Sequence, residues 1–412
     1  MSTSSFADSQ ALFDRATRVI PGGIYGHASP ANLVPTEFPC YAARARGCRY
    51  WDVDGNEIID FLCGYGPVVL GYQHPEVEEA ADRQRRLGDC FNHPTPVMIE
   101  LAERLVKLVD FADWAVFGKN GSDMTTWAVQ VAREFTGRKN VLRARQSYHG
   151  THGWCTPGHG GLIAEDQAHV HFFVWNDLNT VQDVVKQHRG DVAALIITPF
   201  LHPSFAPSEL PAPGFLLELQ NICRKEGIVF ILDDIRAGFR LHLGGSHRYF
   251  GFEPDLICFS KALGNGHPLS AALGRKGLRV AASRVFLTGS FWYSAVPMAA
   301  ALACLRVLER DNGIPHMLKM GERLLEGLSA RAAKHGLQVR GSGPPSLPLM
   351  TFANETNLLR QQRFGIEAVR RGVLFHPHHN WFMSAAHQER DIDQALAIAD
   401  EAFTVVRAEF GG

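Results

Sequence analysis

Two apolar runs of the sequence end in residues that can do nucleophilic and acid–base chemistry. One run, at residues 256–260, leads directly into Lys261 and a glycine-containing turn, and another, at residues 228–232, ends in Asp233 and Asp234. Both runs are typical of short buried strands that carry a polar group to their C-terminal ends. A lysine in such a place suits an amine that must lose its proton and form a Schiff base.

An aspartate at a neighbouring strand end gives this lysine a chemical partner. A carboxylate can keep a pyridine nitrogen protonated, and the protonated ring is what makes pyridoxal phosphate (PLP) an electron sink. Lys261 and Asp233 together therefore predict a PLP enzyme in which both residues are catalytic. Each residue also has a structural alternative, because an acid after a strand often caps a helix and a lysine after a strand often lies at the surface.

A separate turn is a candidate for holding the cofactor phosphate. Gly121 and Ser122 open a helical run that continues through Arg133. Backbone N–H groups and the positive end of the helix dipole at such a turn bind phosphate. The alternative is that Ser122 is an ordinary N-cap residue. The turn is not a Walker loop, because no Gly-Lys-Ser/Thr follows a spaced glycine.

An aromatic ring and an imidazole follow the predicted strand at residues 140–144. Tyr148 can stack on a pyridine ring, and His149 lies beside it in the same loop. The alternative is that both are structural. Another histidine-rich segment, at residues 376–379, lacks the accompanying carboxylates of a typical metal site, and we predict no metal there.

Composition places the chain among ordinary globular proteins. It has 412 residues, a formal net charge of -1 and 46% hydrophobic residues. This balance gives no global field for nucleic acid or an anionic membrane, so neither is an expected partner. The apolar runs are too short to span a bilayer, and the N-terminus has no secretory signal. The eight cysteines show no CxxC pair, which favours a cytoplasmic protein without a disulfide framework.

Helical stretches alternate with short apolar runs from about residue 62 to residue 305, which predicts an α/β fold with a mainly parallel central sheet between helices. Beyond residue 312 the pattern changes to a long helix, mixed short strands and a final helix. We therefore predict a large PLP-binding domain at 62–311. The N-terminal segment 1–61, which contains a hairpin, and residues 312–412 are expected to form a smaller α+β domain.

A set of motifs spread along nearly the whole chain resembles one family, the class III aminotransferases, and within it the branch of the glutamate-1-semialdehyde aminomutases. In chain order the motifs are Pro21-Gly22-Gly23, Asp52-Val53-Asp54-Gly55-Asn56, Gly66-Pro67-Val68-Val69-Leu70-Gly71, Gly121-Ser122-Asp123, Tyr148-His149-Gly150, Asp233-Asp234-Ile235-Arg236-Ala237-Gly238-Phe239-Arg240, Ser260-Lys261 and Gly289-Ser290-Phe291. The resemblance implies fold type I and a homodimer with shared active sites.

The resemblance also implies a role for each site residue. Lys261 would form the internal aldimine and then shuttle protons, and Asp233 would pair with the pyridinium nitrogen. Ile235 and Tyr148 would pack on opposite faces of the ring. The cofactor-binding set is completed by His149 and by the phosphate-binding residues Gly121, Ser122 and, from the partner subunit, Ser290.

Departures from the family pattern bear on the substrate. An arginine that grips the substrate carboxylate in the aminomutases is matched by Ser29, and the family's Glu-Pro becomes Thr198-Pro199. Losing a bidentate carboxylate clamp argues against aminomutase activity. Arg236 and Arg240 are candidates to bind the carboxylate of a keto acid. The predicted substrate residues are Tyr25, His27, Tyr65, Trp175, Arg236, Trp292 and His379.

We expect a transaminase that moves an amino group from a large, hydroxylated or partly apolar primary amine to a keto acid such as pyruvate, leaving pyridoxamine phosphate between the half-reactions. The subgroup most similar in its motifs is formed by enzymes that deaminate long-chain aminopolyols such as hydrolysed fumonisins. An amino-sugar aminotransferase, a glutamate-1-semialdehyde type aminomutase and a racemase or decarboxylase on the same scaffold are the alternatives. A catalytically silent PLP-fold protein is disfavoured by the intact Lys261 and Asp233.

Overall fold

The computed structural model describes residues 4–26, 33, 37–158 and 160–411. The chain forms two compact units. The first comprises Met1–His74, Ser204–Pro207 and Pro315–Gly412, and the second comprises Pro75–Pro203 and Ser208–Ile314. Among the described residues, the helices lack the length and apolar character that crossing a membrane requires.

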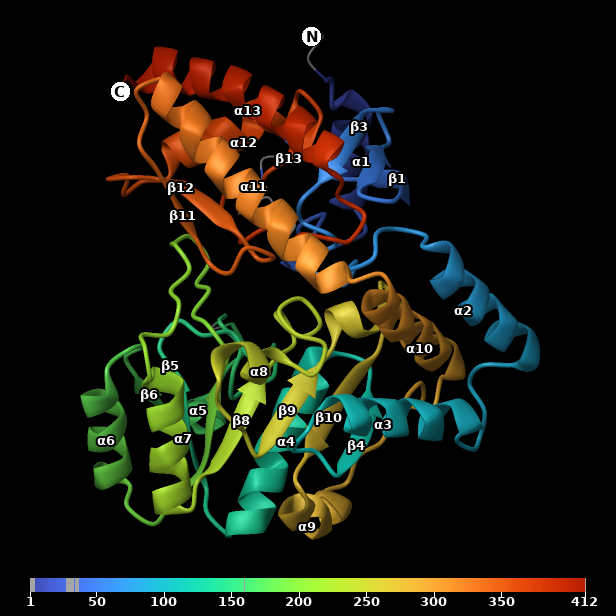
Figure 1. Cartoon of the computed structure of the whole chain (residues 1–412), viewed down its shortest axis with the longest axis vertical. Coiled ribbons are helices and arrows are strands. Elements are labelled where there is room, and N and C mark those ends of the chain that lie inside the picture. Colours follow the sequence, from blue (N-terminus) through green and yellow to red (C-terminus); the bar gives the residue numbers. More distant parts are fainter. Residues whose placement is uncertain (1–3, 27–32, 34–36, 159, 412) are drawn as a thin grey trace. The chain divides into compact units, whose positions relative to one another are not determined.

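The second unit contains a seven-stranded sheet with the order β4-β10-β9-β8-β7-β5-β6 (Figure 1). Neighbouring strands pair in parallel from β9 to β6, whereas β10 is antiparallel to both β9 and β4. The predicted α/β fold with a mainly parallel sheet is confirmed. The strands are β4 (Trp114–Gly118), β5 (Asn140–Ala144), β6 (Val170–Phe173), β7 (Val192–Ile197), β8 (Val229–Asp233), β9 (Leu256–Phe259) and β10 (Ser270–Gly274).

The sequence of the central strands explains why they are covered on both faces. In β7 the run Val-Ala-Ala-Leu-Ile-Ile is buried at each position, and the five residues of β8 are buried as well. A strand without polar alternation is typical of a parallel sheet that lies between helices. Because the C-terminal ends of parallel strands meet at one edge, the residues that follow β9, β8, β7, β5 and β6 share one side of the sheet.

Helices of the second unit cover this sheet and extend from it. α4 packs against β7, β8, β9 and β10, while α10 packs against α2 and α3. The helices are α2 (Pro75–Leu87), α3 (Pro96–Leu108), α4 (Gly121–Thr136), α5 (Ala164–Gln167), α6 (Leu178–Gln187), α7 (Phe215–Glu226), α8 (Ser246–Phe250), α9 (Arg279–Arg284) and α10 (Ala295–Arg310), with the short 3-10 turns η2 (Lys261–Gly264) and η3 (Lys276–Leu278).

The first unit joins segments from both ends of the chain. Its main sheet has the order β1-β2-β3-β13, and β13 pairs in parallel with β3. The predicted hairpin turns at Gly55, where φ is +84°. The elements are α1 (Ala7–Ala16), β1 (Ala42–Arg46), β2 (Arg49–Asp52), β3 (Glu57–Asp60), α11 (Gly313–Lys334), β11 (Val339–Ser342), β12 (Leu349–Phe352), α12 (Leu359–Val369), β13 (Val373–Leu374) and α13 (Glu389–Phe410).

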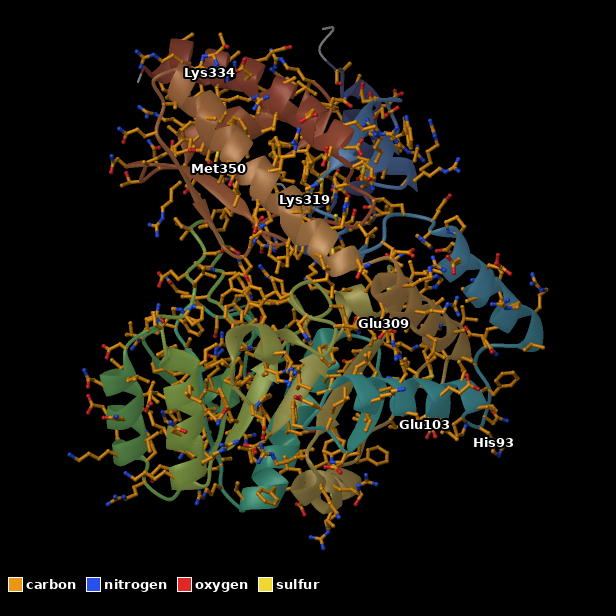
Figure 2. All side chains as sticks on the ribbon, viewed as in Figure 1. His93, Glu103, Glu309, Lys319, Lys334 and Met350 are labelled. Carbon is orange, nitrogen blue, oxygen red and sulfur yellow. The ribbon has the colours of Figure 1, made fainter. Side chains whose placement is uncertain are left out.

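Many charged side chains of the first unit lie at its surface, although Asp52, Asp60, Glu367 and Asp391 are buried. Lys319 of α11, labelled in Figure 2, forms an ion pair with Glu389 of α13 at 2.9 Å. Solvent-exposed pairs of this kind contribute little to stability, typically about 0–1 kcal/mol. The stability of each unit therefore comes mainly from its buried apolar side chains.

Truncating a buried side chain of the central sheet should destabilise the second unit. Leu195 of β7 is 0% exposed, and Leu195→Ala should lower the free energy of unfolding by roughly 2–5 kcal/mol through lost burial and a cavity. The matched control is Leu217→Ala in α7, where the side chain is 45% exposed and the expected change is within about 0.5 kcal/mol. Chemical denaturation followed by fluorescence measures both, and equal effects would contradict the assignment of β7 to the core.

Candidate active site

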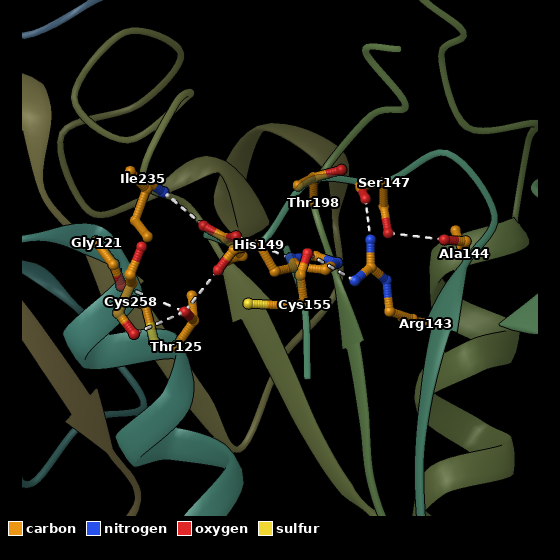
Figure 3. Close-up of polar contacts among 12 residues, drawn as sticks. Gly121, Thr125, Arg143, Ala144, Ser147, His149, Cys155, Thr198, Ile235 and Cys258 are labelled. Carbon is orange, nitrogen blue, oxygen red and sulfur yellow. Dashed lines mark hydrogen bonds and ion pairs between the residues drawn. The ribbon is translucent and has the colours of Figure 1, made fainter. Parts of the chain in front are cut away.

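Asp233, the last residue of β8, anchors a buried hydrogen-bond network. Its partners His149 and Ile235 are labelled in Figure 3. The Oδ2 atom of Asp233 lies 2.8 Å from Nδ1 of His149, and its Oδ1 atom accepts the backbone N–H of Ile235 at 3.2 Å. The exposed fractions of Asp233 and His149 are 4% and 1%. Burial lowers the pKa of His149, while the hydrogen bond and charge of Asp233 oppose that shift. The result is a neutral imidazole that donates from Nδ1 to a fixed carboxylate.

The loop that carries Tyr148 and His149 is held from two sides. The Arg143 guanidinium on β5 donates to the carbonyl oxygens of Ser147 and Cys155, the latter at 3.1 Å. On the other side, the Thr125 hydroxyl of α4 donates to the His149 carbonyl at 2.7 Å. These contacts fix the imidazole against Asp233. Sequence analysis did not identify Arg143 or Thr125. Arg143 could have been identified, because an arginine within an otherwise apolar predicted strand indicates a buried polar contact.

The N-terminus of α4 is packed closely against two other site segments. A Cβ atom on Gly121 would lie 2.6 Å from Cδ1 of Ile235, and one on Gly150 would lie 2.4 Å from Oγ of Ser122. The Ser122 hydroxyl accepts the backbone N–H of Thr151 at 3.1 Å. Glycine is therefore required at both positions for the three segments to meet.

Asn120, and not Ser122, is the N-cap residue of α4. Asp123 completes the capping box by accepting the Asn120 N–H at 2.8 Å. The alternative interpretation of Ser122 as the N-cap residue is therefore wrong. The N-terminus of this sixteen-residue helix carries the positive end of the helix dipole and the N–H groups of the first turn. It lies against the segments of Ile235 and Gly150 described above, and such a terminus fits a phosphate group.

Lys261 begins η2 directly after β9, with a left-handed backbone φ of +45°. Desolvation lowers the pKa of its amine well below the usual lysine value, and the charges of Arg236 and Arg240 lower it further, whereas Asp233 raises it. A neutral amine is the form that acts as a nucleophile or as a base. Lys261, Asp233 and the α4 terminus thus supply the three kinds of group that PLP needs.

Two buried arginines lie near this lysine. Arg236 is 9% exposed and Arg240 is fully buried. Burial lowers the pKa of Arg236 to about 10, while Asp233 and Tyr148 raise it. Burial also raises the pKa of the half-buried Tyr148, so its phenol stays protonated. The site therefore combines the positive charge of buried arginines with the buried carboxyl group of Asp233.

His202 is a site residue that sequence analysis did not identify. It follows β7, is 5% exposed, and neither ring nitrogen has a hydrogen-bond partner among the described residues. Burial lowers its pKa well below the usual histidine value, and the charges of Arg236, Lys261 and His149 contribute. The imidazole of His202 is therefore neutral and lies within electrostatic range of Arg236 and Lys261. The sequence feature that could have identified His202 is a histidine that follows a predicted strand and a proline-containing turn.

The other predicted substrate residues lie in different places. Trp175, after β6, is buried, and Trp292 packs against the core of the second unit. Ser290, predicted to bind the cofactor phosphate of the partner subunit, is exposed. Tyr65 and His379 belong to the first unit, where their rings meet edge to face with centroids 5.3 Å apart. Tyr25, also in the first unit, is 80% exposed. His27 and Ser29 lie outside the described residues.

No group of three or more histidine, cysteine, aspartate or glutamate side chains in the described part of the chain is arranged to hold a metal ion. In the predicted histidine segment, His376 Nδ1 instead accepts the backbone N–H of His378 at 3.1 Å, and His379 Nδ1 contacts the carbonyl of Asn380 at 2.6 Å.

A parallel-sheet edge that brings together a lysine of lowered pKa, a buried aspartate and a helix N-terminus that suits a phosphate group is the arrangement expected of a PLP-dependent enzyme of fold type I. The profile of the family described as aminotransferase class-III matches residues 32–400. The chain therefore belongs to the class-III aminotransferases, and it is a PLP-dependent aminotransferase. The family prediction from the sequence motifs is confirmed.

Similar proteins give further detail. The chain is 43% identical to an aminopentol aminotransferase of Sphingopyxis macrogoltabida, with 97% of this chain and 94% of that protein covered. It is 31% identical to a glutamate-1-semialdehyde 2,1-aminomutase of Syntrophobacter fumaroxidans, covering 97% and 98%. Its fold matches the PLP internal aldimine form of the FumI protein of Sphingopyxis sp. MTA144 with a TM-score of 0.96 at 42% identity, over 98% of each chain.

Asp234 makes the second unit sensitive to pH. Its carboxyl is 0% exposed and accepts the Ser246 N–H at 2.7 Å. Burial raises its pKa from 3.8 to about 7, with Asp233 adding to the shift and the Ser246 hydrogen bonds opposing it. Between these two values the folded chain holds a proton that the unfolded chain releases, so stability falls as the pH rises.

We expect Asp234→Asn to remove this dependence. An amide can still accept the Ser246 N–H but carries no charge at any of these pH values. The free energy of unfolding of the wild-type protein, relative to that of the variant, should fall by on the order of 2–4 kcal/mol between about pH 4 and pH 7. Denaturant titrations at several pH values measure the difference, and a difference that does not change with pH would refute the buried-acid assignment.

Proposed function

We propose that this aminotransferase takes its amino group from a large primary amine that carries hydroxyl and apolar groups, and passes it to a keto acid such as pyruvate. The observation that carries the substrate class is the 43% identity, over 97% of the chain, to an enzyme named for an aminopentol. Thr198 supports it, because it stands where the family's glutamate would add a negative charge, and its hydroxyl donates to the Phe200 carbonyl at 2.8 Å.

We assign the cofactor contacts to residues of the proposed PLP-binding domain, 62–311, with the small domain formed by 1–61 and 312–412. Gly121 and Ser122 would hold the phosphate at the α4 terminus. Asp233, oriented by His149, would hold the proton on the ring nitrogen, and Ile235 and Tyr148 would pack on the ring faces. PLP bound there supplies an aldehyde carbon that takes up the amino group and a ring that accepts electron density.

Lys261 is proposed to move the proton during the reaction. Its lowered pKa favours the neutral amine, which would be the group that holds the cofactor through its aldehyde and the base that would take the proton from the carbon bearing the amino group. Arg236 is the proposed contact for the keto-acid carboxylate, because a guanidinium binds a carboxylate through two parallel hydrogen bonds. Arg240 is the second candidate, although its complete burial also suits a structural role.

We further propose a homodimer in which Ser290 of one subunit contributes to the phosphate site of the other. The support is the apolar surface around this residue, where Phe286 is 86% exposed and Phe291 is 65% exposed. Large apolar side chains gathered at the surface are typical of protein interfaces. A cytoplasmic location is supported by the eight cysteines, each of which is a free thiol, as is usual in a reducing compartment.

A second candidate function is an aminomutase, which the 31% identity to a glutamate-1-semialdehyde 2,1-aminomutase favours. The two functions differ in what happens to the cofactor. A transaminase leaves its cofactor aminated when no keto acid is present, whereas an aminomutase returns it to the starting form within one turnover.

The substrate class can be tested with the PLP-loaded enzyme and no keto acid. We expect a long-chain amine with several hydroxyl groups to bleach the yellow absorption faster than either alanine or an unsubstituted amine of equal length, because only the first amine satisfies polar and apolar parts of the site together. Stopped-flow absorbance measures the rates. Faster bleaching by alanine would refute the proposed substrate class, and an absorption that recovers without keto acid would favour the aminomutase.

The role of Lys261 can be tested by Lys261→Ala. Losing the proposed acid–base group should slow amination of the bound cofactor by at least about 100-fold, with circular dichroism unchanged. The matched control is Lys276→Ala, because Lys276 is exposed in η3, away from the site. A Lys261→Ala enzyme with the wild-type amination rate would refute the proposed mechanism.

A further inference from the structure

A cavity of about 540 Å³ opens at the C-terminal ends of β5, β6 and β7, beside the site already described. This volume is within the range of small-molecule pockets. The cavity wall combines apolar and charged side chains, among them Arg145, Phe172, Val174, Trp175, Leu201 and Glu209.

The apolar part of this wall is open to a ligand. Phe172 is 37% exposed and Val174 is 44% exposed, although both side chains are apolar. The Arg145 guanidinium lies 5.9 Å from the centroid of the Phe172 ring. Arg145 and Glu209 carry opposite formal charges, so the wall has no net charge to select a charged occupant. The composition fits an uncharged chain that carries both apolar and polar groups.

Two buried polar groups along this edge have unused hydrogen-bonding capacity. Trp175 is 6% exposed and its indole N–H has no partner among the described residues. The same holds for both ring nitrogens of His202. A buried donor or acceptor left unsatisfied is costly, and native proteins rarely leave one without a ligand or water. An indole N–H only donates and a neutral imidazole both donates and accepts, so hydroxyl groups can satisfy both residues.

Residues that line the cavity are close in the sequence to residues of the proposed reaction centre. Leu201 of its wall is followed by His202, and Arg145 belongs to the loop that continues to Tyr148 and His149. In the sheet order β9-β8-β7-β5-β6, Lys261 follows β9 and Trp175 follows β6. Four strand spacings of about 4.8 Å separate these ends, or about 19 Å. That span exceeds an amino acid and suits a long-chain amine.

We propose that this cavity binds the distal part of the amine substrate, an alkyl chain bearing hydroxyl groups, with His202 and Trp175 as hydrogen-bonding contacts along the way. The inference rests on the proposed function, since it names the place where the tail of the large amine lies. His202 and Trp175 are positioning residues for the hydroxyl groups, whereas Phe172, Val174 and Leu201 cover the methylene groups.

The first test uses a probe that needs no turnover. It is a straight-chain aliphatic polyol without an amino group, long enough to span about 19 Å, which should inhibit amination of the holoenzyme by a short amine. Val174→Trp should fill part of the cavity and raise the inhibition constant by at least about tenfold, the effect of excluding about two methylene groups. Leu217→Trp on α7, where the side chain is 45% exposed and outside the cavity wall, is the matched control and should leave the constant unchanged.

The outcomes separate this inference from the proposed function. Equal inhibition of the wild-type and Val174→Trp enzymes would overturn the cavity assignment, even if long-chain amines are good substrates. Inhibition that depends on Val174 would support it, even if long-chain amines are not aminated and the proposed function fails. A change confined to the KM of the keto acid would show that the cavity binds the acceptor instead, and would overturn the inference.

The second test concerns the hydroxyl groups. Trp175→Phe keeps an aromatic ring against Phe215, whose centroid lies 5.1 Å from the indole, but it removes the N–H donor. The wild-type enzyme should bind the polyol more tightly than a mono-alcohol of equal length. In the variant, the ratio of the two inhibition constants should shrink by at least about threefold, as expected for the loss of one hydrogen bond. A merely structural role would weaken both ligands equally, and an unchanged preference would exclude Trp175 as a hydroxyl contact.

Discussion

The buried carboxyl group of Asp233 at the end of β8 is the constraint on which the rest of the site depends. A buried carboxylate is costly unless it is hydrogen-bonded and faces positive charge. Here His149 and the Ile235 N–H supply the hydrogen bonds, and the positive charge of Arg236 interacts with it. The same positive surroundings, together with burial, keep the Lys261 amine neutral. One arrangement thus prepares both an acceptor for a ring proton and a free amine.

The network is rigid because its parts come from elements that are themselves fixed. Thr125 of α4 holds the His149 carbonyl, and Arg143 of β5 holds the loop on either side. Gly121 and Gly150 let α4 and that loop approach Ile235 and Ser122 to distances that a Cβ atom would prevent. The helix terminus proposed for the phosphate is consequently locked to the carboxylate proposed for the ring nitrogen, which is how a cofactor is oriented before it reacts.

The sequence was most informative where a short-range pattern determined the structure. The buried strands were evident from their apolar runs, and Lys261 and Asp233 from the polar residues that end two of them. Their mutual placement came from the rule that parallel strands share one C-terminal edge. Long-range contacts were out of reach. Nothing local shows that Arg143 spans to Cys155 or that His202 lies within electrostatic range of Lys261. The Asn120 cap of α4, in contrast, is a local contact with Asp123, three residues further on. Trp175 was predicted as a substrate residue from its residue type alone. The cavity beside it could not be predicted, because residues at the ends of three separate strands form its wall.

Under the proposed function, buried donors and acceptors without a partner among the described residues would set how strongly this enzyme discriminates between amines. An apolar pocket distinguishes substrates by only about 10–200-fold per methylene group, whereas a site built to hydrogen-bond a substrate hydroxyl rejects the analogue without it far more strongly. Trp175 and His202 retain such unused groups within the described chain, and His202 remains neutral beside the positive charge of Arg236 because burial lowers its pKa. A neutral imidazole does not select a carboxylate. Under the proposed function, selectivity therefore comes from pairing uncharged polar groups with hydroxyls, and the fixed arginines remain for the keto acid.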